Sequence, residues 1–347
     1  MRIGIYTHYA HCDEAYFAVR LADFLKSQNI EFTLYSKTKP AKLHAGYDNI
    51  VQHKQTMPYT RWLKSVSCVL WTHVPKNEQL NCAKRRNLQT VIVPMWQDLM
   101  QPFRKAMRAA DHIVALSSES RELFKSVYKF KNVTLIPFDV GLPVVKKSNR
   151  NDEKAVKIFL PWFEKNARCT HSDFLASLGW LLERAPEAHL TVAISSSRFS
   201  PAIAKFFKLL SARTNNRVKL VRNIPLERRP AMYTAHDVTL IPGECDNYGL
   251  CALTSVTCGT PVFTFAVPPQ TDFIKSDVNG FLVRTEVDYD ENGVPHANPD
   301  YEKLLAAIQA VIAEPWHIDS LNKKTAYNLD ARRKAYVIGW QTLLKLV

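Results

Sequence analysis

One segment, residues 233–261, restricts the fold of this chain more than any other. Residues 238–241 form an apolar run that fits a buried strand, and a polar turn follows at 242–247. A helix is predicted over residues 248–258, because the glycine that follows supplies a common helix stop. A proline then leads into a second apolar strand at 262–266. A strand, a turn, a helix and a second strand in this order indicate a parallel α/β sheet.

The turn in this segment has the chemistry of a site for an anion and a sugar. A turn that joins the carboxyl end of a parallel strand to a helix is where α/β sheets bind anionic ligands. We therefore expect free backbone amides near Gly249 and Leu250 to hold a diphosphate. The same turn carries Glu244, Asp246 and Asn247, whose oxygens suit sugar hydroxyls. Helix capping is the alternative use of these side chains, but a cap needs only one of them.

Strands and helices alternate along the rest of the chain, which implies parallel sheets covered on both faces. Further strands are predicted at residues 2–7, 30–35, 68–73, 90–96, 112–116, 133–137, 156–160, 189–195 and 218–221. Helices are predicted at residues 13–27, 101–110, 120–127, 172–184, 201–214, 226–236 and 324–346, and a hairpin-like insertion at 288–299. We expect a basic domain over residues 1–145, a second Rossmann-like domain over 146–325, and a C-terminal helix over 326–347 that crosses back to the first domain.

Length and composition limit the class of protein. A chain of 347 residues with 46% apolar residues can form two α/β domains with full cores. No apolar run reaches the ~18 residues that a membrane helix needs. Because the sequence opens on a predicted strand with no apolar leader before it, we expect no signal peptide. The seven cysteines are odd in number and include no C-x-x-C pair, which favours free thiols over disulfides or zinc. We expect a cytoplasmic protein without a bound metal.

The positive charge of the chain is concentrated in its first part. Residues 1–150 hold 23 Lys and Arg against 11 Asp and Glu, whereas residues 151–347 hold 23 against 21. Charge that serves only solubility does not predict this asymmetry. The first domain is therefore expected to meet an anionic partner, with nucleic acid favoured over a membrane surface.

Several motifs resemble those of retaining GT-B glycosyltransferases, in particular glycosyltransferase family 4. Tyr248-Gly249 and Gly259-Thr260-Pro261 fall where that family has Phe-Gly and Gly-Thr-Pro. The family has an acidic residue two positions before Phe-Gly and a glutamate after seven intervening residues. Those positions are Asp246 and Thr254 here, so the second acid, which the family uses on the donor ribose, is replaced. Weaker matches extend the resemblance over residues 85–145 and 155–345, through segments 110–117, 120–123, 135–137, 224–225 and 279–283.

This resemblance implies an α/β fold of two Rossmann-like parallel-sheet domains that face each other across a cleft, the GT-B arrangement. It also implies a nucleotide-sugar co-substrate, expected to be a UDP-sugar, with no further cofactor. The family binds the diphosphate in the loop after the first strand of the second domain, where Lys165 and Arg168 are the available cations. The expected donor-binding residues are Lys165, Arg168, Glu244, Asp246, Asn247, Tyr248, Gly249, Leu250 and Thr254.

Three residues are candidates for activating the acceptor hydroxyl. In retaining members the leaving diphosphate assists the acceptor, whereas inverting members need a carboxylate or histidine as base. Asp13 follows the first predicted strand, although it equally suits the start of the next helix. Asp98 follows the strand at 90–96, and His73 ends the strand at 68–73, where a core role is the alternative.

The basic segment of the first domain is the expected acceptor surface, through Arg61, Lys64, Lys84, Arg85, Arg86 and Arg104. We expect a glycosyltransferase, and the favoured acceptor is a hydroxymethylated base in DNA, as in phage DNA-modifying glycosyltransferases. Cations there would follow the phosphates, and interleaved aromatic residues would stack on a flipped base. The alternatives are a bacterial envelope polysaccharide or lipopolysaccharide glycosyltransferase on an anionic membrane, and a catalytically inactive nucleotide-sugar-binding module. No obligate protein partner is expected.

Overall fold

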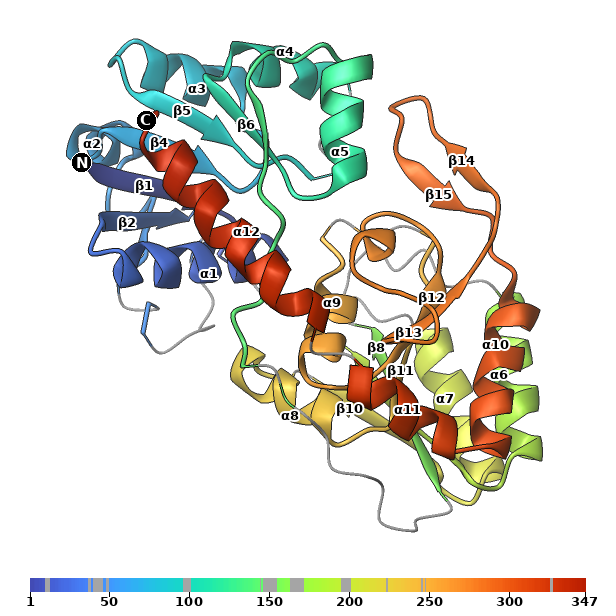
Figure 1. Ribbon diagram of the computed structural model, residues 1–347. Coiled ribbons are helices and arrows are strands. Elements are labelled where there is room, and N and C mark those ends of the chain that lie inside the picture. The colour runs from blue at the N-terminus through green and yellow to red at the C-terminus, as the bar shows by residue number, and fades with distance from the viewer. Residues whose placement is uncertain are drawn as a thin grey trace. The chain divides into compact units, whose positions relative to one another are not determined.

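The computed structural model describes most of the chain and divides it into two compact units (Figure 1). Unit 1 comprises Met1–Gly141, Asp290–Val294 and Ala331–Val347, and unit 2 comprises Leu142–Tyr289 and Pro295–Asp330. The described residues are 1–9, 13–36, 39, 46–47, 50–95, 101–143, 145, 155–162, 172–194, 201–222, 224–244, 246, 248–324 and 327–347.

Unit 1 is built on a sheet of parallel strands in the order β3-β2-β1-β4-β5-β6-β7. These strands are β1 (Arg2–Thr7), β2 (Glu31–Ser36), β3 (Gln52–His53), β4 (Cys68–Trp71), β5 (Gln89–Ile92), β6 (His112–Ala115) and β7 (Val133–Leu135). β1 lies inside the sheet, where its Ile3 pairs with Phe32 of β2 on one side and with Cys68 of β4 on the other. Since both neighbours run parallel to β1, the carboxyl ends of these three strands meet at one edge of the sheet.

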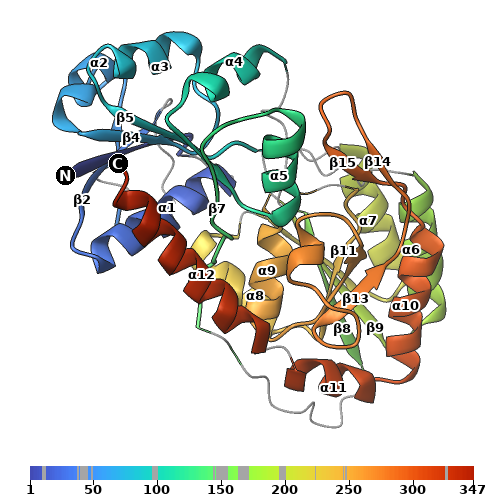
Figure 2. The same cartoon turned by 45° about the horizontal axis from the view of Figure 1, so that its top comes forward.

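Helices cover both faces of this sheet. They are α1 (Asp13–Ser27), α2 (Tyr59–Trp62), the 3₁₀ turn Leu63–Ser65, α3 (Asn77–Lys84), α4 (Gln101–Ala109), α5 (Ser118–Glu122), the π turn Leu123–Val127 and α12 (Tyr327–Leu344). Trp62, Leu80 and Met107 of α2, α3 and α4 belong to one buried cluster with Tyr6 and Trp71 of the sheet. These three helices therefore share one face, and α1 and α12 lie together on the other (Figure 2).

Aromatic packing holds the last helix in unit 1. The ring centroids of Phe17 in α1 and Trp340 in α12 are 6.2 Å apart, and those of Phe24 and Tyr336 are 5.7 Å apart. Arg332 Nε adds a 2.8 Å hydrogen bond to the backbone oxygen of Phe138. Trp340 is fully buried in this packing.

Unit 2 contains a second parallel sheet in the order β10-β9-β8-β11-β12-β13. Its strands are β8 (Val156–Trp162), β9 (Ala188–Ile194), β10 (Val218–Arg222), β11 (Val238–Ile241), β12 (Val262–Phe265) and β13 (Gly280–Val283), and β14 (Val287–Tyr289) and β15 (Pro295–Ala297) form a separate antiparallel pair. The helices and helical turns are α6 (Ser172–Arg184), α7 (Pro201–Arg213), 3₁₀ Leu226–Arg228, α8 (Arg229–Thr234), α9 (Leu250–Thr257), 3₁₀ Gln270–Asp272, α10 (Tyr301–Ala313) and α11 (Trp316–Lys324).

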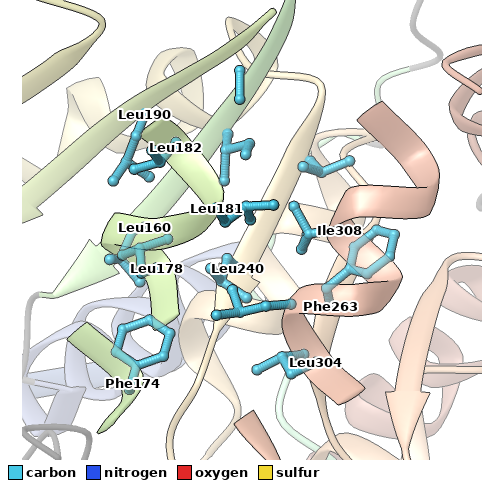
Figure 3. Close-up of a cluster of buried hydrophobic side chains, with 14 of the residues drawn as sticks. Leu160, Phe174, Leu178, Leu181, Leu182, Leu190, Leu240, Phe263, Leu304 and Ile308 are labelled. Carbon is cyan, nitrogen blue, oxygen red and sulfur yellow. The ribbon is translucent and has the colours of Figure 1, made fainter. Parts of the chain in front are cut away.

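The core of unit 2 lies between its sheet and the helices α6 and α10 (Figure 3). Phe174 and Leu178 of α6 are four residues apart and so lie on one face of that helix, as Leu304 and Ile308 do on α10. All four side chains are fully buried against sheet residues that include Phe263. This apolar layer fixes the sheet edge from which the turns of the site extend.

The predicted α/β class, with two Rossmann-like parallel sheets, is confirmed. Residues 226–236, predicted as one helix, form a 3₁₀ turn followed by α8, because Pro230 lies in the first turn of α8 and supplies no backbone donor. The helix predicted at 120–127 begins at Ser118 instead, where Ser117 caps it by accepting from the Ser120 amide. Among the described residues, no helix is both long and apolar enough to span a membrane.

Candidate functional site

The candidate site of unit 2 lies at the carboxyl edge of its sheet. β8 is the central strand, with β9 on one side and β11 on the other. From β8 the chain continues to β9, toward one edge of the sheet, and from β11 it continues to β12, toward the other edge. The order of the strands therefore reverses between β8 and β11, and ligands of doubly wound folds bind at such a switch point. β11 ends at Ile241, immediately before the polar turn that the sequence singles out.

Asp246 organises this turn. One carboxylate oxygen, Oδ1, accepts hydrogen bonds from the backbone amides of Gly249 at 2.9 Å and Tyr248 at 3.2 Å. The other, Oδ2, accepts from the side-chain amide of Gln270 at 3.3 Å. Asp246 is partly exposed, so its carboxylate is oriented by the protein while part of the residue faces solvent.

Gly249 is required by the geometry of the turn. It has φ of +66°, in the left-handed region that glycine adopts without a steric penalty. A Cβ at this position would also lie 2.6 Å from the ring of Phe273. The turn after β11 and the turn after β12 therefore touch at Gly249 and Phe273, and they form one structure at the sheet edge.

The prediction of free amides is wrong at Gly249, because the Asp246 carboxylate already occupies that donor. A diphosphate would reach the Gly249 amide only by replacing this carboxylate. Tyr248 and Leu250 are also not surface groups, since they are 1% and 4% exposed. Within the predicted donor set these two side chains support the turn from beneath.

Thr254 does not take over the role of the missing second acid. It lies in α9, is buried, and its hydroxyl donates a 2.7 Å hydrogen bond to the backbone oxygen of Leu250. Threonine commonly bonds back to the preceding helical turn in this way. Of the two family positions, only residue 246 carries a carboxylate in this chain.

Of the remaining predicted donor-binding residues, Glu244 has a backbone contact to β15, and the other three lie outside the described residues. The backbone oxygen of Glu244 accepts a 2.8 Å hydrogen bond from the amide of Ala297, which ties the turn to β15. Lys165, Arg168 and Asn247 lie outside the described residues. β8 ends at Trp162, shortly before the two cations.

Unit 1 has an equivalent edge, where β1 lies between β2 and β4. The hydroxyls of Thr7 and Thr72, which end and follow these strands, are 2.9 Å apart and buried. His8 Nδ1 lies 3.7 Å from Glu14 Oε2, and the rings of His73 and Tyr6 are 5.5 Å apart. Of the predicted acceptor-activating residues, only His73 is placed at this edge with its side chain. Asp13 begins α1, but its side chain, like the whole of Asp98, lies outside the described residues.

Tyr6, which contacts His73, and the two tyrosines packed against Tyr6 stay neutral. Burial raises the pKa of Tyr6, and a hydrogen bond from Gln79 lowers it in part. Burial also raises the pKa of Tyr35 and Tyr59, with the neighbouring tyrosines adding to the effect. These phenols therefore provide packing and hydrogen bonds, and they are not bases at physiological pH.

The predicted acceptor-surface cations fall into two groups. Arg61, Lys64, Arg85 and Arg86 are exposed on the helices α2 and α3 and the turns that follow them.

Lys84 and Arg104 are engaged within unit 1. Lys84 Nζ forms a 2.5 Å ion pair with Asp111 Oδ1. Arg104 lies 4.5 Å above the ring of Tyr128 and donates at 3.1 Å to the side chain of Asn292. Both side chains thus make contacts within unit 1, although the sequence places them on the predicted acceptor surface.

Sequence reasoning missed Gln270 and Phe273, which complete the site from the turn after β12. One signal was present: residues 267–273 follow an apolar strand that is adjacent to β11, so they reach the same sheet edge. Across the part of the chain that the structure describes, no group of three or more His, Cys, Asp and Glu side chains could hold a metal ion.

Comparisons with known proteins agree with this architecture. The sequence profile of the family "Glycosyl transferases group 1" matches residues 146–328, more than half of the chain. A D-inositol 3-phosphate glycosyltransferase of Nocardiopsis dassonvillei is 27% identical over 251 residues, which are 67% of this chain and 54% of that protein. Another from Xylanimonas cellulosilytica is 32% identical over 104 residues, which are 29% of this chain and 25% of that protein. The chain thus spans about half or less of the length of these curated relatives.

Solved structures resemble the whole chain at low identity. Sucrose-phosphate synthase from Thermosynechococcus elongatus has a TM-score of 0.72 at 16% identity and covers 100% of this chain and 98% of its own. Anabaena HepE in complex with UDP-glucose has a TM-score of 0.71 at 14% identity, covering 99% and 100%. The lipopolysaccharide outer core galactosyltransferase WaaB has a TM-score of 0.62 at 15% identity, covering 100% of both chains.

These likenesses establish the fold, which is the GT-B fold with its two Rossmann-like sheets. The family match lies over unit 2, which contains the turn built around Asp246. The chain therefore belongs to the group 1 glycosyl transferase family.

Proposed function

We propose that this chain transfers a sugar from a nucleotide diphosphate sugar, with UDP as the nucleotide, to a hydroxyl group of an anionic acceptor. The observation that carries the proposal is the position of the Asp246 carboxylate at the carboxyl edge of the unit 2 sheet. Hydrogen bonds to both of its oxygens orient it there, in a chain that belongs to this family. A fixed carboxylate can accept hydrogen bonds from vicinal sugar hydroxyls. HepE, which shares the fold, is seen with UDP-glucose, and this supports the choice of donor.

Transfer breaks the bond between the anomeric carbon and the diphosphate oxygen and forms a bond from that carbon to the acceptor oxygen. The leaving UDP keeps the bonding electron pair, and the acceptor hydroxyl releases its proton. Lys165 and Arg168 are the proposed cations for the growing diphosphate charge. Asp13, Asp98 and His73 remain the proposed receivers of the proton in an inverting reaction.

The acceptor is proposed to belong to the bacterial envelope. WaaB, which shares the fold, acts by its name on the lipopolysaccharide outer core, and this supports the envelope. The two curated relatives act by their names on inositol 3-phosphate, which supports an anionic acceptor. Hydroxymethylated DNA rests on the positive charge of residues 1–150 and is the second candidate. An anionic membrane that presents the acceptor suits the same charge.

The exposed basic face of unit 1 supports an anionic partner. Arg61, Lys64, Arg85 and Arg86 are exposed on the helices α2 and α3 and on the turns that directly follow them. Both helices contribute to the same buried cluster of unit 1. Several exposed cations in one domain favour binding to a surface with many negative charges.

The test is mass spectrometry of acceptors incubated with the protein and a panel of nucleotide sugars. The acceptors are inositol phosphate, lipopolysaccharide core fragments and hydroxymethylated duplex DNA. A sugar adduct on lipopolysaccharide with release of UDP supports the envelope acceptor. An adduct on inositol phosphate alone would keep the proposed transfer to an anionic acceptor but exclude the envelope, and an adduct on DNA alone would replace the acceptor by the second candidate. Binding of UDP without turnover of any nucleotide sugar would identify an inactive binding module.

A further inference from the structure

Gln270 is held at the sheet edge by hydrogen bonds of its backbone. Its backbone N–H donates to the backbone oxygen of Val267 at 3.0 Å, and its backbone oxygen accepts from the N–H groups of Phe273 and Ile274 at 3.1 and 2.8 Å. The residue is fully buried, at 0% exposure. Burial restricts the conformations of its side chain, and in the observed conformation the side-chain amide donates to Asp246.

We propose that Gln270 is a positioning residue that holds the Asp246 carboxylate in the orientation that recognises the donor sugar. The inference rests on the proposed function. Backbone amides hold Oδ1, and the Gln270 side-chain amide holds Oδ2 at 3.3 Å. Without the Gln270 side chain, the hydrogen bond to Oδ2 is lost, and the carboxylate of Asp246 is held less firmly in this orientation.

A neutral amide suits this task better than a cation would. Lysine or arginine at this position would pair with the carboxylate and compensate the charge that attracts sugar hydroxyls. An amide donates one hydrogen bond and leaves the negative charge in place. Because Thr254 replaces the second family acid, the orientation of this single carboxylate matters more here.

The other end of the Gln270 side chain indicates a functional demand. Its carbonyl oxygen Oε1 is buried and has no hydrogen-bond partner among the described residues. A buried, unpaired carbonyl costs stability, and an apolar side chain of the same size would avoid this cost. A glutamine that served only for packing would therefore be a poor choice, whereas a glutamine that holds Asp246 has a reason to be there.

The test compares Gln270→Met with the wild type in binding and turnover. Methionine has a similar length and no donor, so we expect kcat/KM for the UDP-sugar to fall about tenfold, the loss of one hydrogen bond to a charged group. The Kd of UDP, which lacks the sugar, should stay unchanged, and the melting temperature should stay equal or rise. Gln309→Met, at an exposed position of α10, is the matched control and should leave all three values unchanged. Gln270→Leu repeats the test with a different apolar shape if the methionine variant fails to fold.

A double-mutant cycle separates positioning from packing. In an Asp246→Ala background, Gln270→Met should cause no further loss of turnover, because the group that it positions is gone. Equal, additive losses in both backgrounds, or wild-type turnover in Gln270→Met, would overturn the inference while leaving the proposed function intact. A parallel loss of UDP and UDP-sugar affinity would also overturn it, by showing a general disturbance of the site. If the wild type binds no nucleotide sugar, the proposed function fails and this inference fails with it.

Discussion

Asp246 combines a structural task with a proposed recognition task, and substitutions can separate the two. Asp246→Asn keeps an oxygen for the amides of Tyr248 and Gly249, so the turn should persist and the free energy of unfolding should change little. Asp246→Ala removes that acceptor and should cost about 1 kcal/mol, because the two backbone amides lose their hydrogen-bond partner. Both variants should lose turnover by about a hundredfold or more, since neither carries the charge. Chemical denaturation and initial-rate measurements on the three proteins test this; an active alanine variant would exclude Asp246 from the site.

Gly249 offers a second prediction at the residue scale. Gly249→Ala should destabilise the chain by about 1–3 kcal/mol, because φ is +66° and the new Cβ would collide with Phe273. Phe273→Leu in the same chain should relieve the collision and leave the backbone penalty. Denaturant unfolding of the single and double variants measures both parts. Unchanged stability of Gly249→Ala would mean that the turn adopts another conformation in solution.

The sequence could point to Asp246, but it could not tell what the carboxylate does. The acid before Tyr248-Gly249 was visible as a motif, and so was the replacement at Thr254. That the Gly249 amide is already occupied depends on the rotamer of Asp246, which no local pattern encodes. Gln270 meets Asp246 across 24 residues of chain, through the pairing of β11 with β12. Such a contact follows from tertiary structure only.

At the scale of elements, the core between α6, α10 and the unit 2 sheet carries the stability of the site. Leu304 of α10 is fully buried in this layer, so Leu304→Ala should cost about 2–5 kcal/mol of unfolding free energy. Leu209 of α7 is 53% exposed, and Leu209→Ala should stay within about 0.5 kcal/mol of the wild type. Urea unfolding of the two variants provides the comparison. Equal effects would show that the α10 layer is not the core of unit 2.

Asp111 links α3, β5 and β6, and its contribution to the free energy of unfolding should depend on pH. Asp111 accepts from Lys84 and from the amide and hydroxyl of Thr90. Burial pushes the pKa of Asp111 upward, but these hydrogen bonds and the Lys84 charge outweigh it and hold the pKa below its usual value. The stabilisation is therefore present above the unfolded pKa of about 3.9 and is lost as pH falls through the lower folded pKa. Asp111→Asn should be less stable than the wild type at pH 7, and the difference should shrink at pH 3; a difference that does not change with pH would contradict this.

Strong local signals decided which elements the sequence could predict. β11, α9 and β12 follow from two apolar runs and the glycine and proline between them, and β1, α1 and α6 begin and end where predicted. α3 and α10 were not predicted, although α10 has an N-cap in Asp300, which accepts from the Lys303 amide. The sequence pattern joins the 3₁₀ turn Leu226–Arg228 to α8 in one predicted helix, because a 3₁₀ turn and the first turn of an α-helix have similar apolar spacing.

At the scale of the whole molecule, the uneven charge predicts a salt-dependent partner. Replacing Arg61, Lys64, Arg85 and Arg86 by serine should weaken binding to anionic phospholipid vesicles and reduce its salt dependence, with UDP affinity unchanged. Serine at four exposed cations of unit 2, Lys205, Lys208, Lys219 and Arg222, is the matched control. Vesicle co-sedimentation at several salt concentrations measures the difference. Equal losses of vesicle binding in both quadruple variants would show that only the net charge of the chain matters. If the wild type binds duplex DNA and no vesicles, the DNA acceptor is favoured.

The most direct measurement is calorimetric binding of UDP and of a UDP-sugar to the wild type and to Asp246→Asn. We predict that the wild type binds the UDP-sugar, and that Asp246→Asn loses this binding while its affinity for UDP alone stays close to that of the wild type. Equal UDP-sugar affinities of the two proteins would contradict a role for the Asp246 carboxylate in gripping the donor sugar.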